Sequence, residues 1–426
     1  MHWQLAAVAL ILLAYAAVSG RLEGTPVTAA MVFTGAGLLF GVEALGLVDP
    51  SATGLTVKVL AEATLAVVLF SDASRIDLAA LRSELGIPAR LLGIGLPLTI
   101  AAGFVAALAL LGDLAWSEAL LLAIILAPTD AALGQAVVTL PRLPVRLRQS
   151  LNVESGLNDG ICVPLFLVAL AIAQAEEGAV GGGHAAELVL EKIGWGIVAG
   201  TLAGAVAALI VVHAGARHLI ARPWLQIAPI AAAGLAFGFA EAIGGSGFIA
   251  AFVGGGVFGG LRKRRGGDVS YLLEEMGAVL GAVTFIVFGA VLLGPALTDL
   301  DWQIALYALL SLTVVRMLPV AISLLGTGSR RPTVAFLGWF GPRGAASIVF
   351  ALLVLEEGGL PNDDLILSTA FVTVGLSVLA HGVTAAPLAS RYADWLDAHP
   401  LPSLPPTESG EGTEVRWRLE RKEDTA

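Results

Sequence analysis

Long apolar segments return at short intervals along most of the chain, and they constrain its fold more than any other feature. Charged residues make up 14% of the 426 residues, hydrophobic residues make up 57%, and the mean hydropathy is +0.86. A soluble domain has about 25% charged residues, and about 20 consecutive apolar residues can cross a bilayer core. The pattern excludes an ordinary soluble globule and predicts an all-α membrane protein that crosses the bilayer many times.

Hydropathy predicts about thirteen transmembrane helices, within residues 1–390. In chain order, the expected spans cover residues 3–19, 26–46, 54–71, 88–111, 116–140, 149–174, 187–212, 225–241, 246–260, 271–296, 302–325, 332–355 and 364–389. Residues 391–426 are polar and rich in proline, so we expect a short, disordered cytoplasmic tail there.

Basic residues gather in alternate loops. Examples are Arg142, Arg146 and Arg148 in one loop and residues 262–265 in another, whereas the intervening loops are acidic or neutral. Because basic residues mark cytoplasmic loops, this pattern places the N-terminus outside and the C-terminus in the cytoplasm. No basic residue precedes the first span and Arg21 follows it, so we expect a retained helix rather than a cleaved signal peptide.

Composition narrows the partners and cofactors. The net charge of −10 does not suggest a nucleic-acid partner. The apolar spans make the lipid bilayer the expected surroundings. The single cysteine, Cys162, excludes an internal disulfide and the cysteine pairs of a zinc site.

Polar residues inside the spans are costly in a bilayer, so each one is a candidate functional residue. They fall in four spans. These residues are Thr129 and Asp130 after Pro128 in the fifth span, Glu154, Ser155, Asn158 and Asp159 in the sixth, Arg316 in the eleventh, and Arg343 in the twelfth.

Chain counting places four of these groups, Asp130, Asp159, Arg316 and Arg343, at a similar depth near the middle of the bilayer. We therefore expect one buried cluster of charges that neutralise each other. A carboxylate surrounded by amide, hydroxyl and carbonyl oxygens can bind an alkali cation, and it can bind a proton instead. Competition between the two at Asp159 would produce exchange.

The fifth and twelfth spans are both interrupted by glycine and proline, and they lie seven spans apart. An odd offset means that they cross the membrane in opposite directions. This relation is expected of inverted-topology repeats, here spans 1–6 and 8–13 joined by span 7, and paired broken helices in such repeats indicate a transporter's binding site.

Three motifs resemble those of the monovalent cation:proton antiporter superfamily, in its Asn-Asp branch of NhaP-like and NHE-like sodium/proton exchangers. The motifs are Thr129-Asp130, Glu154-Ser155 with Asn158-Asp159, and Gly341-Pro342-Arg343-Gly344. The resemblance covers about residues 1–390.

The resemblance implies a homodimer in the inner cell membrane, with a moving core and elevator-like alternating access. It implies no cofactor, and transport of Na⁺, or of Li⁺ or K⁺, against H⁺. Asp159 would be the essential carboxylate for cation and proton, with Ser155 and the Thr129 main chain as ligands and Asn158 as support. Because Asn158 stands where some relatives carry a second acid, electroneutral one-for-one exchange is expected.

The resemblance also implies roles for the other charges. Glu154 would pair with Arg343, and Asp130 would compensate the ends of the half helices, with Arg316 nearby. Asp72 resembles an acidic residue that contributes to the cation site. Independently of the resemblance, Glu62 lies in the middle of the third span and is a candidate for lining the cytoplasmic funnel or the pathway.

Besides a passive cation channel with a similar buried acid, two alternatives stay open. The first is K⁺/H⁺ rather than Na⁺/H⁺ exchange, because the ligand types do not determine selectivity. The second is an intramembrane serine protease, since residues 244–247 form a Gly-Gly-Ser-Gly string containing Ser246, and His381 lies in a later span.

Overall fold

The computed structural model describes residues 2–22, 24–47, 54–76, 86–176, 182–263, 271–357, 359–400, 405 and 408, and within them every regular element is a helix. In chain order the elements are α1 (His2–Leu22), α2 (Ala29–Phe40), α3 (Gly54–Arg75), α5 (Gly86–Arg90), η2 (Leu91–Gly95), α6 (Leu96–Leu110), α7 (Trp116–Ile125), η3 (Ala131–Gly134), α8 (Gln135–Thr139), α9 (Val145–Glu176), α10 (Gly182–Ala216), α11 (Arg222–Ala242), α12 (Gly247–Lys263), α13 (Tyr271–Val287), η4 (Phe288–Leu293), α14 (Gly294–Thr298), α15 (Trp302–Leu312), α16 (Val314–Ser323), α17 (Arg331–Trp339), α18 (Ala345–Glu357) and α19 (Asp363–Ala398).

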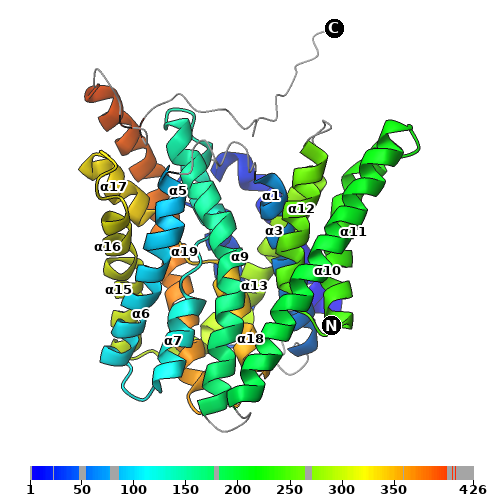
Figure 1. Ribbon diagram of the computed structural model, residues 1–426. Helices are drawn as coiled ribbons and strands as arrows, with labels where there is room; N and C mark the ends of the chain where they lie inside the picture. Colours follow the sequence, from blue (N-terminus) through cyan, green and yellow to red (C-terminus); the bar gives the residue numbers. More distant parts are fainter. Residues whose placement is uncertain are drawn as a thin grey trace.

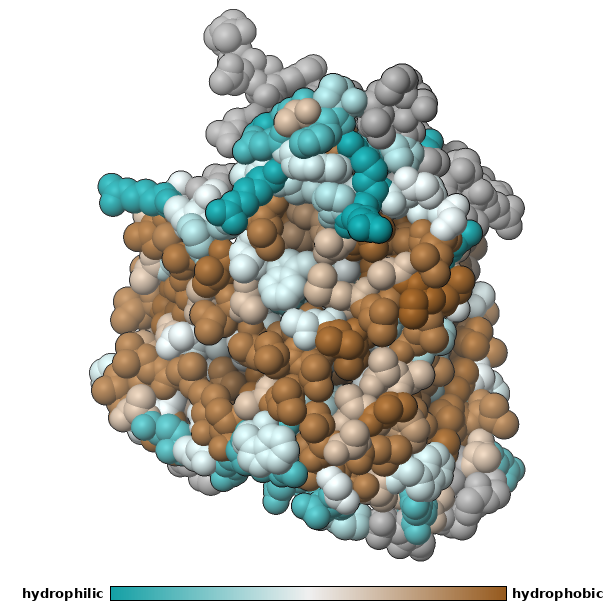
Figure 2. All heavy atoms as spheres, turned by 90° about the vertical axis from the view of Figure 1, so that its left-hand side faces the viewer, coloured by the Kyte–Doolittle hydropathy of each residue, from teal (hydrophilic) through white to brown (hydrophobic). Residues whose placement is uncertain are grey.

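Most helices run along one common direction (Figure 1), and on the face that Figure 2 shows an apolar band lies between two polar ends. Each of the expected spans is a helix or a pair of half helices. Within the described ranges, 8 helices are long and apolar enough to cross a membrane, and shorter apolar helices such as α2, α7 and α12 lie among them. The predicted all-α, polytopic fold is confirmed.

The helices pack into two groups. We call α1–α3 and α10–α14 with η4 the α12 group, because α12 contacts α3, α10 and α11 most extensively. We call α5–α9 and α15–α19 with η2 and η3 the α9 group, in which α7 packs on α6 and α9, and α19 packs on α15 and α18. The two groups meet mainly where α9 and α19 contact helices of the α12 group.

Two helices of the α9 group are broken at the middle. The chain is non-helical between α7 and η3, where Pro128 has no N–H to donate, and between α17 and α18, where Gly341 and Pro342 lie. Figure 1 places α7 and α18 in the lower half of the molecule and α17 in the upper half, so the two broken helices run in opposite directions. They cross where the Asp130 N–H donates to the Pro342 carbonyl oxygen at 2.8 Å.

The C-terminal part differs from the expectation in one respect. Helix α19 continues to Ala398, past the expected boundary at residue 390, and Arg142 binds Asp394 and Asp397 at 2.8 and 2.6 Å. Among the residues beyond 400, only 405 and 408 are described, so the expected tail lies almost entirely outside the described residues. Glu408 is 2% exposed and contacts Arg330 at the start of α17.

Candidate cation-binding site

Asp159 lies on α9 beside the crossing, and it is 6% exposed. Its Oδ1 atom is buried and has no hydrogen-bond partner among the described residues. The next residue, Gly160, packs directly against the ring of Phe252 on α12, where a Cβ atom would overlap the ring. A buried carboxylate oxygen without a partner costs free energy unless a cation or a proton reaches it.

Ser155 and Asn158 attach α9 to the break between α7 and η3. The Ser155 hydroxyl donates to the Thr129 carbonyl oxygen at 2.6 Å and accepts from the Ala131 N–H at 2.9 Å. The Asn158 amide donates to Thr129 Oγ1 at 2.7 Å, and Asn158 Oδ1 accepts from the Thr129 N–H at 3.4 Å. These contacts join the α9 turn that precedes Asp159 to the main chain and hydroxyl of Thr129.

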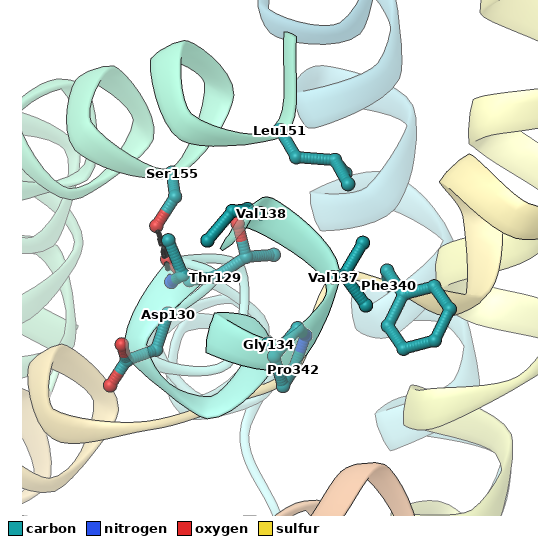
Figure 3. Close-up of a pocket in the computed structure, with 10 residues that line it drawn as sticks. Thr129, Asp130, Gly134, Val137, Val138, Leu151, Ser155, Phe340 and Pro342 are labelled. Atoms are coloured by element: carbon teal, nitrogen blue, oxygen red, sulfur yellow. Dashed lines mark hydrogen bonds between the residues drawn. The ribbon is translucent and has the colours of Figure 1, made fainter. Parts of the chain in front are cut away.

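A small pocket opens beside Thr129 and Ser155 and is lined by both broken helices (Figure 3). Thr129 and Asp130 come from the first break, Phe340 and Pro342 from the second, and Ser155 from α9. In Figure 3, Ser155 lies above Thr129 with their hydrogen bond drawn. Ser155 and Thr129, the predicted ligands, therefore border a small cavity at the crossing.

Asp130 lies at the N-termini of two half helices. Its Oδ1 accepts from the Ala132 N–H at 2.8 Å at the start of η3, and its Oδ2 accepts from the Ala345 N–H at 3.1 Å at the start of α18. A negative charge is favourable there because helix N-termini carry unpaired N–H groups and a partial positive charge. Gly344 allows this approach, because a Cβ atom at that position would overlap the carboxylate.

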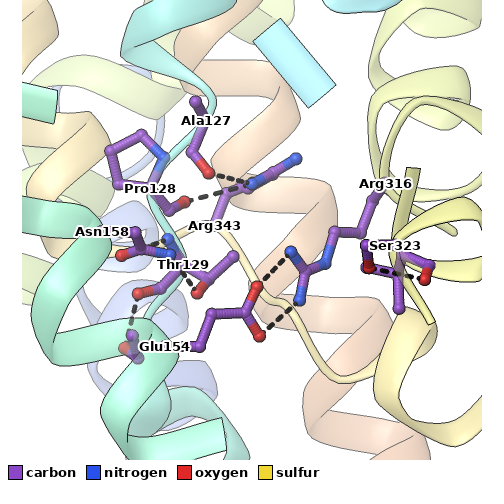
Figure 4. A network of polar contacts seen from close by, with 10 residues as sticks. Ala127, Pro128, Thr129, Glu154, Asn158, Arg316, Ser323 and Arg343 are labelled. Carbon is purple, nitrogen blue, oxygen red and sulfur yellow. Dashed lines mark hydrogen bonds and ion pairs between the residues drawn. The ribbon is translucent and has the colours of Figure 1, made fainter. Parts of the chain in front are cut away.

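Arg343 occupies the opposite kind of position. It is fully buried, and its NH1 donates to the carbonyl oxygens of Ala127 at 2.6 Å and Pro128 at 3.3 Å, just past the C-terminus of α7 (Figure 4). Ser347 on α18 donates to the Ile125 carbonyl oxygen at 2.7 Å. A positive charge and a hydroxyl donor therefore satisfy the C-terminal carbonyls that the break leaves open.

The predicted pairing of Glu154 with Arg343 is wrong. Arg316 on α16 donates to both carboxylate oxygens of Glu154, at 2.6 and 2.9 Å, and both side chains are 3% exposed (Figure 4). Arg343 is already bound to the α7 carbonyls, so Arg316 provides the charge for Glu154. Arg316 was expected near Asp130, but its ion pair is with Glu154, and it packs against Gly341.

Asp72 and Glu62 lie on α3, in the other helix group. Asp72 packs against Gly156 on α9, one turn from Asp159, and its carboxylate is 4.0 Å from Arg75. The Glu62 carboxylate is 3.7 Å from the Lys58 ammonium. Asp72 therefore faces the helix that carries Asp159, whereas the Glu62 carboxylate contacts a neighbouring residue of its own helix.

The residues of the protease alternative have separate partners in the described part of the chain. Ser246 Oγ accepts from the Ile249 N–H at 3.4 Å, as a cap of α12. The ring nitrogens of His381 face Trp339 and Ser377 in the α9 group. Ser246 is thus a helix cap, and among the described hydrogen bonds none joins it to His381.

Sequence reasoning missed two serines that bind the breaks, Ser347 and Ser377. Ser347 bonds the end of α7, and Ser377 accepts from the Arg343 N–H at 2.7 Å. Isolated hydroxyls in apolar spans could have indicated them, because a buried hydroxyl is usually hydrogen-bonded, and a broken helix leaves backbone groups without a helical partner. A buried carboxylate with an unpartnered oxygen beside two charge-compensated broken helices is typical of a secondary ion transporter.

The chain belongs to the sodium/hydrogen exchanger family. The family model described as "Sodium/hydrogen exchanger, transmembrane" matches residues 8–391. The chain is therefore a multi-pass membrane protein of the cation:proton antiporter class.

Known relatives and solved structures agree with this membership. The chain is 28% identical over 401 residues to the K⁺/H⁺ antiporter NhaP2 of Shewanella sp. (strain MR-4), and this alignment covers 93% of this chain and 67% of that protein. It is 29% identical over 353 residues to the Na⁺/H⁺ antiporter NhaP of Pseudomonas aeruginosa, which covers 76% of this chain and 78% of that protein. The sodium proton antiporter MjNhaP1 of Methanocaldococcus jannaschii has the same fold, with a TM-score of 0.74 and 19% identity over 90% of this chain and 98% of that one.

Proposed function

We propose that this antiporter exchanges Na⁺ for H⁺, one for one, with Asp159 binding the cation and the proton in turn. The observation that carries the proposal is the buried Asp159 carboxylate, which has an unpartnered oxygen at the crossing of the broken helices. In the described residues, Glu154 is neutralised by Arg316, and Asp130 is bound by backbone N–H groups. Asp159 is therefore the carboxylate of this cluster best suited to release and rebind a cation.

The proposed ligands lie on the α9 turn that precedes Asp159 and on the break to which that turn is bonded. Ser155 Oγ and the Thr129 main chain would supply oxygens to the cation, and Asn158 would fix Thr129 through its two hydrogen bonds. Asp72, across Gly156, would add negative charge on the approach to the site. Arg343, Asp130, Glu154 and Arg316 would keep the crossing rigid and electrically balanced. Such a cluster lets the net charge of the loaded site stay the same with one Na⁺ or one H⁺ bound.

The two helix groups support elevator-like movement of the α9 group against the α12 group. Within the α12 group, several glycines approach the backbone of the neighbouring helix, as Gly200 does at Ala250 and Gly255 at Phe70. Between the groups, the glycines lie on α9 and α19 and face side chains instead. These contacts are Gly156 with Asp72, Gly160 with Phe252, Gly375 with Leu293, and Gly382 with Met31. Side chains can rearrange as one surface slides over another, whereas backbone contacts fix two helices together.

The proposal also includes a homodimer, an orientation in the membrane and a pair of inverted repeats. A homodimer through the α12 group would hold one body still while the other moves. The charge pattern of the loops favours an outside N-terminus and a cytoplasmic C-terminus in the cell membrane. The repeats would comprise α1–α9 and α11–α19, because their broken helices run in opposite directions.

Exchange of K⁺ for H⁺ is the second candidate, and it is favoured by the K⁺/H⁺ names of the Shewanella relatives.

The test is cation-induced dissipation of a pH gradient in proteoliposomes, with Na⁺, Li⁺ and K⁺ in turn. We expect Na⁺ to be effective, Asp159→Asn to abolish transport, and Asp299→Asn, on an exposed loop, to transport normally. A membrane voltage imposed with valinomycin and K⁺ should leave the Na⁺ rate unchanged. Transport that survives Asp159→Asn would contradict the assignment of the carboxylate, and a response to K⁺ alone would select the second candidate.

A further inference from the structure

Two polar residues of α19 hold the two ends of the break between α17 and α18. Arg343 precedes Gly344, and α18 begins at the residue after that. The Arg343 N–H donates to Ser377 Oγ at 2.7 Å. The His381 Nε2 atom lies 2.9 Å from the carbonyl oxygen of Trp339, the last residue of α17. Ser377 and His381 are one helical turn apart, and both are fully buried.

Both ring nitrogens of His381 have hydrogen-bond partners, and these partners bear on where a neutral ring carries its hydrogen. Nε2 faces the Trp339 carbonyl oxygen and Nδ1 lies 3.0 Å from the Ser377 carbonyl oxygen; both oxygens can only accept, so a neutral ring donates to one of them. We assign the hydrogen to Nε2, because the Ser377 hydroxyl beside Nδ1 can donate to an unprotonated Nδ1. Nδ1 is then an acceptor, and Ser377 Oγ lies 3.3 Å from it. The hydroxyl of Ser377 can therefore accept from Arg343 and donate to His381. One continuous chain of hydrogen bonds results, from the Arg343 N–H through Ser377 and His381 to Trp339.

The His381 ring is also fixed by packing. It stacks on the Trp339 ring with the centroids 4.9 Å apart and the planes inclined by 29°. Trp339 Nε1 in turn donates to Thr384 Oγ1 on α19 at 3.0 Å. Trp339 is thus bound to α19 by its carbonyl oxygen, its ring face and its ring N–H. A side chain held this firmly defines the position of the end of α17.

The first break has the same arrangement. There α9, the helix that follows the broken one, holds the break through Ser155 and Asn158. At the second break α19, again the helix that follows, holds it through Ser377 and His381. The two long helices therefore perform equivalent tasks on the two sides of the crossing, although only α9 carries the unpartnered carboxylate.

We propose that Ser377 and His381 are positioning residues for the cation site. This inference rests on the proposed function of Asp159. By fixing both ends of the second break, they hold the Pro342 carbonyl oxygen at the Asp130 N–H and the Ala345 N–H at the Asp130 carboxylate. Asp130 directly follows Thr129, so the position of the Thr129 main chain depends on this attachment. Neither residue contacts the cation.

The experiment compares His381→Leu with His381→Gln in proteoliposomes. Leucine fills similar space without a donor, whereas the glutamine amide can still donate to Trp339. We expect His381→Leu to raise the apparent cation KM about tenfold with a maximal rate within about twofold of wild type. His381→Gln should recover most of this loss and keep the wild-type pH profile. His213→Gln, near the exposed end of α10, is the matched control and should change nothing.

Three results would overturn the proposal: an unchanged KM in His381→Leu, a loss of maximal rate at unchanged KM, or a shifted pH profile in His381→Gln. If His381→Leu does not fold, Ser377→Ala removes one link of the chain and should raise KM about threefold to tenfold. Asp159→Asn separates the two proposals. If Asp159→Asn is active and His381→Leu still raises KM, the proposed carboxylate alone is refuted. If Asp159→Asn is inactive and His381→Leu leaves KM unchanged, the positioning role alone is refuted.

Discussion

Arg316 binds Glu154 through both oxygens of its carboxylate, at 2.6 and 2.9 Å, in a site where each side chain is 3% exposed. The pair joins α16 to α9, the helix that carries Asp159 five residues further on. A bidentate pair of this kind is geometrically specific as well as strong. It fixes the rotation of α9, and because it neutralises Glu154 it would keep that carboxylate from competing for the cation that we propose Asp159 binds.

Breaking this pair should strongly destabilise the protein. Arg316→Met leaves the Glu154 charge buried and unpaired, which costs about 3–5 kcal/mol, whereas replacing both residues by apolar ones is often close to neutral. We therefore expect a lower melting temperature in detergent for Arg316→Met and a recovery in the double variant Arg316→Met/Glu154→Met. Glu154→Gln should not rescue Arg343→Ala, because these residues are not partners. A rescue there would contradict the pairing seen in the structure.

Gly344 should not tolerate a side chain. A Cβ atom at this position would overlap the Asp130 carboxylate, and Asp130 would lose its bond to the Ala345 N–H. We expect Gly344→Ala to lose most of its cation-driven transport, measured as proton flux in proteoliposomes. Gly256→Ala on α12 is the control, because a Cβ atom there meets nothing within 4 Å. It should be neutral or stabilising by about 0.5–1 kcal/mol. Equal activity of the two variants would argue against the crossing as the site.

Two lysines of the α12 group bind two neighbouring glutamates at the end of α18. Lys58 on α3 binds Glu356, and Lys192 on α10 lies 3.6 Å from Glu357. Because α18 belongs to the α9 group, these pairs fasten the two groups at one end of the molecule. Partly exposed pairs contribute about 0.2–1 kcal/mol each. Removing both with Lys58→Gln/Lys192→Gln should therefore raise the frequency with which this end opens about twofold to tenfold.

Cysteine labelling measures this change. In a Cys162→Ser background, a cysteine at Ile348, which is 1% exposed and lines the pocket between α18 and α3, should react faster with a water-soluble maleimide in the double variant. High salt should accelerate labelling of the parent protein in the same direction, because it screens exposed pairs. A cysteine at Val137, which lines the pocket beside Thr129, should not react faster. Acceleration at both positions would indicate general loosening instead.

Protons and cations should compete for the site. If Asp159 binds one or the other, lowering the pH raises the apparent cation KM and leaves the rate at saturating cation unchanged. Once protons dominate, the KM should rise about tenfold for each pH unit. Initial rates at several Na⁺ concentrations between about pH 6 and about pH 9 measure this. A constant KM over that range would reject competition, and Glu62→Gln should keep the wild-type dependence.

Glu408 should stabilise the start of α17 although it lies far along the chain. Its Oε1 accepts from the Arg330 N–H at 3.1 Å and from the Thr333 hydroxyl at 2.6 Å, in the manner of a helix cap. Loss of such a cap costs about 0.5–2 kcal/mol. We therefore expect Glu408→Ala to lower the melting temperature slightly and Glu408→Gln to lower it less. A chain ending at residue 400 should melt as Glu408→Ala does, and wild-type melting would show that the contact contributes nothing.

The sequence by itself determined the all-helical membrane fold and the position of each break. Apolar length indicates a span, and Pro128 and the Gly341-Pro342 pair lack the donors and side chains that continue a helix. Asp159 was also identified in this way, as a carboxylate at mid-depth beside Asn158 and Ser155. All these inferences concern the position of a residue along the bilayer normal, which chain counting gives directly.

Only the tertiary structure decided which groups meet at that depth. Arg316 and Arg343 lie at similar depths, so counting could not tell which of them binds Glu154, and packing brings Arg343 to the α7 carbonyls instead. The same applies to His381 at the end of α17 and to Glu408 at its start. Lateral neighbours depend on how each helix is rotated and packed, and every polar group left open by a break takes whichever partner that packing supplies.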